Sequence, residues 1–152
     1  MTETTGSPKL LFPGLAGFYE SVSDLWYPMV RITIGCILFM HGWVKLTGPG
    51  LAGVTGYFTK IGFPAPEFFA FAAIFLETVG TACIVLGLFT RFFAAALAIE
   101  LGIAFLVIHL PHGFSAAGGG YEYVLLLGIV MFAIALRGGG PYSIDRMIGK
   151  EL

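Results

Sequence analysis

The sequence predicts an all-α integral membrane protein, a four-helix bundle with short helices at the membrane surface. Its composition is the first observation: 57% of the 152 residues are hydrophobic, 11% are charged, and the mean hydropathy is +0.90. Soluble domains carry about 25% charged residues, so eight basic and nine acidic side chains are too few to cover a water-facing surface. The second observation is four long apolar runs. Hydrocarbon offers no hydrogen bonds to the backbone, so runs that cross it must be helical.

The four runs span residues 25–44, 67–88, 92–110 and 121–136. Each comes close to the roughly 20 residues that a membrane-spanning helix needs, although the fourth is shorter. Prolines and glycines mark their ends: Pro28 in the first turn, Pro66 before the second run, Pro111 after the third, and Gly138 to Pro141 after the fourth. Proline is tolerated in a first helical turn and stops a helix elsewhere. The alternative, four core helices of a soluble protein, conflicts with the scarcity of charge.

Two connecting segments, residues 15–26 and 51–61, place apolar side chains at helical spacing opposite polar ones. This pattern predicts short amphipathic helices at the membrane surface, with an ordinary loop as the alternative for the second segment. We therefore divide the chain into an N-terminal segment with an amphipathic helix (1–24), a four-helix membrane domain (25–137) and a tail (138–152). The N-terminus lacks the apolar core of a cleaved signal peptide.

Positive charge predicts the orientation, because cytoplasmic connections of membrane proteins are enriched in Lys and Arg. One side of the predicted bundle holds Lys9, Arg91, Arg137, Arg146 and Lys150, and the other holds Lys45 and Lys60. Both termini are therefore expected in the cytoplasm. The net charge of −1 gives no basic field, so nucleic acid is not an expected partner.

Three charged residues lie deep within the apolar runs: Arg31, Glu77 and Glu100. An unpaired charge there costs at least about 2.5–3.5 kcal/mol. Helical rise places all three at similar depth, so we expect Arg31 to face both glutamates across the bundle interior. One arginine cannot neutralise two carboxylates, and we expect Glu77, the deeper one, to be often protonated. Such a site suits proton-coupled redox chemistry or transport, and the alternative is a static ion pair that locks the helices.

A second polar cluster is predicted at the outer membrane boundary. It consists of His41, Lys45, His109, His112 and Glu122. Histidines there can relay protons or hydrogen-bond the carbonyls of a quinone, and the alternative is contact with lipid headgroups. The spacing is not that of a metal site. On an ideal helix, His109 would point away from Glu100.

An ordered set of short motifs runs along the chain. It comprises Arg31 with Gly35, the His41-Gly42-x-x-Lys45 segment, Glu77, the Leu86-Gly87-Leu88-x-Thr90-Arg91 turn, His109, Glu122 and Gly140-Pro141-x-Ser143-x-Asp145. Over about residues 25–145 this set resembles the DoxX family of small four-helix bacterial membrane proteins. The chain departs from the family's closing motif, G-P-G-x-x-S-x-D, because no glycine follows Pro141.

The resemblance implies a multi-pass protein of the bacterial inner (plasma) membrane that is tied to respiratory or thiol redox chemistry. Relatives act as subunits of thiosulfate:quinone oxidoreductase, and others associate with oxidative-stress proteins. The chain has no cofactor-binding fold of its own, so a quinone or a redox-protein partner would supply the redox centre.

Three functions stay open from the sequence. In the first, the protein is a quinone-linked oxidoreductase subunit in which His41, Lys45 or His109 polarises the quinone and Arg31, Glu77 and Glu100 handle protons. In the second, it is a structural or assembly partner of a redox complex, without chemistry of its own. In the third, it transports a small organic solute, and so short a chain would then have to act as a homo-oligomer.

Overall fold

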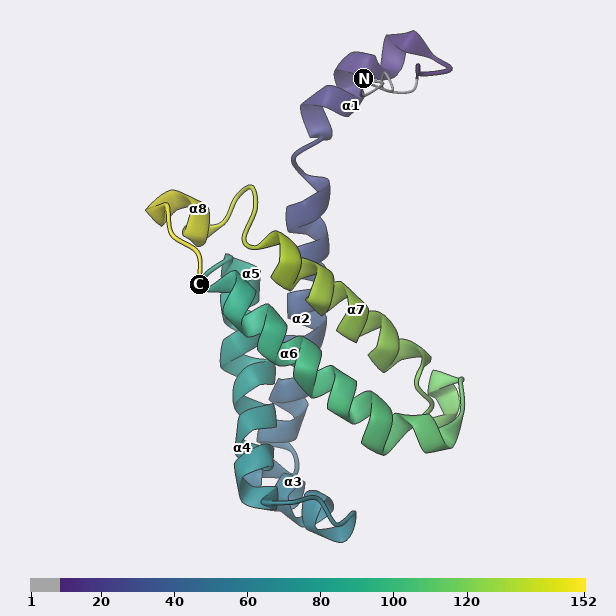
Figure 1. Cartoon of the computed structure of the whole chain (residues 1–152), viewed down its shortest axis with the longest axis vertical. Helices are drawn as coiled ribbons and strands as arrows, with labels where there is room; N and C mark the ends of the chain where they lie inside the picture. The colour runs from purple at the N-terminus through teal and green to yellow at the C-terminus, as the bar shows by residue number, and fades with distance from the viewer. Residues whose placement is uncertain (1–8) are drawn as a thin grey trace, which may run out of the picture.

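The computed structural model describes residues 9–152, which fold into helices joined by short turns, with no strand in that range (Figure 1). The first eight residues of the predicted N-terminal segment lie outside the described part. The α-helices are α1 (Ala16–Val22), α2 (Trp26–Thr47), α3 (Gly50–Lys60), α4 (Pro66–Phe75), α5 (Thr81–Leu86), α6 (Thr90–Ala104), α7 (Glu122–Arg137) and α8 (Ile144–Ile148). Two turns are π-helical: η2 (Leu76–Gly80) lies between α4 and α5, and η3 (Phe105–His109) follows α6. Three short 3₁₀ turns complete the described helices: η1 (Pro13–Leu15), η4 (Leu110–His112) and η5 (Ala116–Gly118).

Three continuous helices are long and apolar enough to cross a membrane: Trp26–Thr47, Pro66–Leu86 and Thr90–His112. The second joins α4, η2 and α5, and the third joins α6, η3 and η4. The fourth predicted run forms α7, whose 16 residues extend about 24 Å at 1.5 Å per residue. That is shorter than a hydrocarbon core of about 30 Å. The all-α membrane class is therefore confirmed, and the bundle of four spanning helices is confirmed only in part.

The helices pack as two units. α2 packs along α5 and η2, while α3 packs against α4. α6 and α7 pair along their length as a hairpin that runs obliquely across the first unit (Figure 1). Their main core includes Leu38, Ile84, Leu97 and Met131, each at most 1% exposed. Large apolar side chains such as Phe71 cover much of the outside, as expected where lipid rather than water is the solvent.

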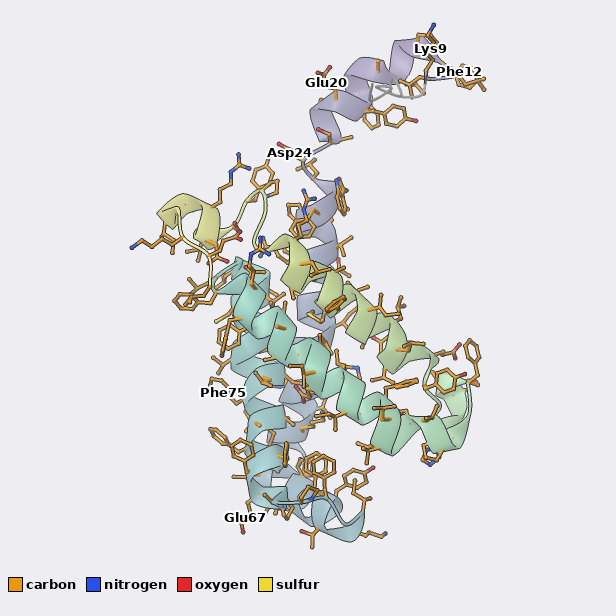
Figure 2. The ribbon with its side chains drawn as sticks, in the orientation of Figure 1. Lys9, Phe12, Glu20, Asp24, Glu67 and Phe75 are labelled. Carbon is orange, nitrogen blue, oxygen red and sulfur yellow. The ribbon has the colours of Figure 1, made fainter. Side chains whose placement is uncertain are left out.

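The two predicted amphipathic segments are both helical. α3 matches residues 51–61 closely and buries Val54 against Ala70 and Ile74, so the loop alternative for this segment is wrong. In the first segment, the helix breaks at residues 23–25 before α2 begins. Figure 2 shows Lys9, Phe12 and Glu20 on this N-terminal stretch, which projects away from the bundle.

Candidate functional site

A cavity of about 740 Å³ lies between α2, α3 and α4 on one side and the α6–α7 hairpin on the other. Most of its wall is apolar, with Phe58, Phe63 and Leu127 among its lining residues. Its ionisable lining residues include His41, Lys45, Glu77, Glu100 and His109. The cavity therefore combines members of the two clusters that the sequence placed at separate depths.

Lys45 and Glu77 form the central ion pair of this cavity. Lys45 Nζ lies 2.5 Å from Glu77 Oε1, and the two side chains are 36% and 7% exposed. The close approach of the two helices depends on Gly42, because a Cβ there would lie 2.6 Å from the Glu77 carbonyl carbon. The pair thus ties α2 to η2 where their backbones nearly touch.

Glu100 adds a second acid to the same cavity. Glu100 Oε2 and Glu77 Oε2 are both buried and have no hydrogen-bond partner among residues 9–152. Lys45 is the sole Lys or Arg among the residues that line the cavity. One cation therefore faces two carboxyl groups, as the sequence suggested, but the cation is Lys45 and Glu77 is the acid paired with it.

Arg31 lies elsewhere, and its predicted pairing with Glu77 and Glu100 is wrong. The side chain is fully buried and donates hydrogen bonds to the carbonyl oxygens of Ile84 (2.5 Å), Val85 (2.9 Å) and Tyr142 (2.9 Å). The last carbonyls of a helix have no intrahelical partner and carry partial negative charge. The Arg31 guanidinium supplies a donor to the Val85 carbonyl and a second donor to the Ile84 carbonyl at the end of α5, and it ties both to the Tyr142 carbonyl before α8.

The physical reason is the direction in which helical side chains lean. Side chains on an α-helix point toward its N-terminus. α2 and α4–α5 run in opposite directions, so Arg31 leans toward the end where α5 terminates and Glu77 leans the other way. Lys45, near the end of α2, leans back toward Glu77. Equal depth of the Cα atoms was therefore not enough to predict the pairing.

The end of the bundle around Arg31 is closed by several such contacts. Asp145 accepts hydrogen bonds from the backbone N–H groups of Phe89 (2.7 Å) and Thr90 (2.9 Å), which start α6. Arg91 donates to the carbonyls of Ala135 and Leu136 at the end of α7. The motif residues Thr90, Arg91 and Asp145 thus hold helix ends together and lie outside the cavity.

The outer polar cluster is divided by the structure. His41 and His109 line the cavity, whereas His112 and Glu122 do not. The Nδ1 of His112 lies 2.7 Å from the Ile108 carbonyl oxygen, and Glu122 Oε1 accepts a hydrogen bond from the Ala116 N–H at 2.6 Å. These two residues stabilise the turn between α6 and α7.

His109 has a defined hydrogen-bonding state. Its Nδ1 lies 2.8 Å from the Gly119 carbonyl oxygen. A carbonyl can only accept, so Nδ1 carries the hydrogen, and the neutral ring keeps Nε2 as an acceptor. His109 therefore can accept a hydrogen bond when neutral and donate one when protonated.

Both π-helical turns carry a cavity residue: Glu77 lies in η2 and His109 in η3. An α-helix turns by about 100° per residue, so Glu100 and His109 would lie on opposite faces of a regular helix. A π-turn holds one extra residue, and such turns are frequent at functional sites. The extra residue in η3 turns His109 back toward the cavity.

The aromatic wall of the cavity was missed by the sequence analysis. Tyr57 and Phe58 of α3 and Tyr123 of α7 line it, and the ring of Tyr123 lies 6.1 Å from that of His41. The signal for α3 was present, because Val54, Tyr57 and Phe58 recur on one face of the segment. That face had been assigned to the membrane surface, and it covers the cavity instead.

The fold and the site together define a small helical membrane protein with a polar-sided cavity between its helices. The chain belongs to the DoxX family, whose model matches residues 28–110. The predicted resemblance is thereby confirmed.

Similar proteins occur in several bacteria. An uncharacterized membrane protein of Mycobacterium tuberculosis is 30% identical over 134 residues, which are 80% of each chain. The inner membrane protein YqjF of Escherichia coli is 30% identical over 135 residues, covering 87% of this chain and 98% of that protein. An uncharacterized protein of Haemophilus influenzae is 28% identical over 136 residues, 87% of this chain and 97% of its own. No solved structure matches the chain.

Proposed function

We propose that this protein binds a quinone in the cavity and acts as the membrane subunit of a quinone-linked redox system. The observation that carries the proposal is the mixed wall of the cavity. Lys45, Glu77, Glu100, His41 and His109 converge on a space of about 740 Å³ that is otherwise largely aromatic and aliphatic. Sites for small molecules typically enclose about 300–1,000 Å³, with apolar walls and a few polar groups that orient the ligand.

The residues present fit a quinone. Lys45 Nζ has three donors, of which one is directed at Glu77, so others are available to a ligand carbonyl. The buried Oε2 atoms of Glu77 and Glu100 need hydrogen-bond donors, which a quinol hydroxyl offers. Phe58 and Phe63 supply apolar contact for a ring. When bound, a quinone accepts two electrons and two protons at its oxygens; the electrons would come from a redox-protein partner.

Within this proposal, Glu100 holds and delivers a proton. Lys45 balances the charge of Glu77, to which it is paired. A second buried carboxylate would then lack a cation, and burial disfavours the charged form of such a group. Glu100 can therefore carry a proton at a carboxyl oxygen, and His109 can exchange one at Nε2. A lock between helices would need only the Lys45–Glu77 pair and would leave Glu100 unexplained.

The first experiment measures quinone that copurifies with the protein in mild detergent, by solvent extraction and mass spectrometry. Two matched pairs use residues that line the cavity and residues that do not: Glu100→Gln with Glu122→Gln, and His109→Gln with His112→Gln. We expect each cavity variant to lose quinone about tenfold, as for one lost polar contact of about 1.4 kcal/mol, while its control retains it. Equal retention within both pairs, or no quinone in the parent, would contradict the proposal.

The remaining parts of the proposal concern the setting of the protein. We propose that the protein lies in the plasma membrane with both termini in the cytoplasm. A redox-protein partner would supply the electrons. A cysteine introduced at Lys9 should react with a membrane-impermeant maleimide only after the cells are opened. Reaction in intact cells would refute this orientation. A pull-down that recovers no redox protein, together with a stable homo-oligomer in lipid, would favour solute transport instead.

A further inference from the structure

A second pocket, of about 480 Å³, lies at the end of the bundle around α8, far along the chain from the cavity residues of α2 and α4. It is lined by Arg137 at the end of α7 and by Arg146 and Lys150 in the tail. All three basic residues are exposed. The quinone proposal makes no use of this pocket.

Two acids also line the pocket, and both are already engaged. Asp145 is fully buried and accepts from the N–H groups of Phe89 and Thr90, at the N-terminus of α6. Glu151 accepts from Arg91 Nε at 2.6 Å and from the Gly139 N–H at 3.1 Å. The three basic groups therefore retain donors for an external anion.

The position of the pocket indicates what that anion is. α5 ends, α6 begins and α7 ends next to α8 (Figure 1), and the pocket is lined by residues of α8 and of the end of α7. The pocket therefore lies where the apolar helices are expected to leave the hydrocarbon. The Arg137 guanidinium lies over the ring of Trp26, 5.1 Å from its centroid, and tryptophan is enriched at this depth of a membrane. Met147 and Ile148 on α8 are 85% and 52% exposed, next to Arg146. Exposed apolar side chains beside basic ones are typical of helices at the headgroup level.

We propose that this pocket binds the phosphate headgroup of an anionic phospholipid. Arg137, Arg146 and Lys150 contact the phosphate oxygens, and Met147 and Ile148 enter the acyl boundary beside it. Guanidinium groups suit phosphate because their donors match its oxygens in pairs. An anionic lipid is favoured over a zwitterionic one because the pocket offers donors and positive charge, while its own carboxylates are engaged.

The experiment titrates phosphatidylglycerol or phosphatidylcholine into the full-length, delipidated protein in neutral detergent and counts bound lipids by native mass spectrometry. The test variant is Arg146→Gln with Lys150→Gln. The control, Lys9→Gln with Lys60→Gln, has the same net charge and leaves the pocket intact. Each basic residue near anionic lipid contributes roughly fivefold in affinity, so we expect about 25-fold weaker phosphatidylglycerol binding in the test variant only.

Each alternative has its own outcome. Equal affinity for the two lipids, or equal affinity of the test variant and the parent, would overturn the proposal. Displacement of phosphatidylglycerol by an equal concentration of inorganic phosphate would show that the pocket holds free phosphate, and would overturn it as well. Both exposed substitutions should leave the size-exclusion profile unchanged. Quinone retention is measured in parallel, so failure of one proposal is separable from failure of the other.

Discussion

Removing Lys45 alone should destabilise the protein more than removing Glu77 alone, and the two losses should not add. In Lys45→Met, the carboxylate of Glu77, only 7% exposed, loses its cation. Removing one partner of a fully buried pair costs about 3–5 kcal/mol, whereas an exposed pair contributes about 0–1 kcal/mol. Lys45 is 36% exposed, so the pair lies between these limits. We expect the free energy of unfolding to fall by about 2–3 kcal/mol.

The reciprocal change should cost less. In Glu77→Gln, the remaining Lys45 cation can reach polar surroundings through its exposed end, so we expect a loss of about 1 kcal/mol. In the double variant no unpaired charge remains. Its loss should therefore be smaller than the sum of the single losses by about 1–2 kcal/mol, within the range found for residues in contact.

The assay is reversible unfolding in mixed micelles with a rising fraction of SDS, followed by circular dichroism. Lys60→Met serves as the matched control, because Lys60 is exposed at the end of α3. Strict additivity of the two single losses would refute the interpretation of the contact as a coupled pair. Parent-like stability of Lys45→Met would refute the claim that Glu77 depends on this cation.

Three further substitutions test the packing of the bundle by thermal unfolding in detergent. Gly42→Ala should lower stability by about 1–3 kcal/mol, because its Cβ would meet the Glu77 backbone at 2.6 Å, while Gly102→Ala, which has open space, should change little. Asp145→Asn should cost about 1–2 kcal/mol by weakening the two hydrogen bonds to the start of α6. Arg31→Met should cost about 3 kcal/mol, because the Val85 and Tyr142 carbonyls lose the guanidinium donor and the Ile84 carbonyl keeps only its bond from the Gly87 N–H. Quinone per folded protein should be unchanged, and loss of quinone without loss of stability would return Arg31 to the site.

Composition and periodicity predicted the membrane class, the helices and the amphipathic α3, because these depend on local hydrophobicity. They also predicted that one cation would face two acids. The sequence alone did not predict which cation this is. Arg31 and Lys45 lie on one face of α2, and choosing between them requires the lean of each side chain relative to an antiparallel neighbour. The position of that neighbouring helix depends on its close contact with Gly42. A single glycine in the sequence does not show that two helices meet there.

Motifs were a weaker guide to the site than to the fold. Thr90, Arg91 and Asp145 stood out in the sequence as parts of the motifs that resemble the DoxX family. In the structure they satisfy backbone groups at helix ends, a need that is acute where water is scarce. A polar side chain near a predicted helix end should therefore first be considered as a hydrogen-bond partner of backbone groups, before it is considered as a site residue. Glu77 and Glu100 lie within helices whose backbone is already bonded, which is why they lead to the cavity.

The π-turn η3 offers a test of how the third spanning helix builds the site. Deleting Val107, a 47% exposed residue within Phe105–His109, removes the extra residue and allows regular α-helical bonding. Glu100 and His109 would then be separated by eight regular helical steps of about 100° each, which gives His109 the same direction as the π-turn does now. We expect quinone retention to stay at the level of the parent, with a change in stability below about 1.5 kcal/mol because a regular helix replaces a rarer one.

A second measurement makes this test independent of quinone. His109→Cys, with and without the deletion, is labelled with a small water-soluble maleimide, and the rate of labelling reports the surroundings of residue 109. An unchanged rate after the deletion indicates that the side chain still points into the polar cavity. Deleting Leu106 instead should have the same effect, since either loss restores the α-helical repeat. Slower labelling in both deletions would show that His109 has turned toward lipid, and that η3 does not hold the extra residue that sets the direction of His109.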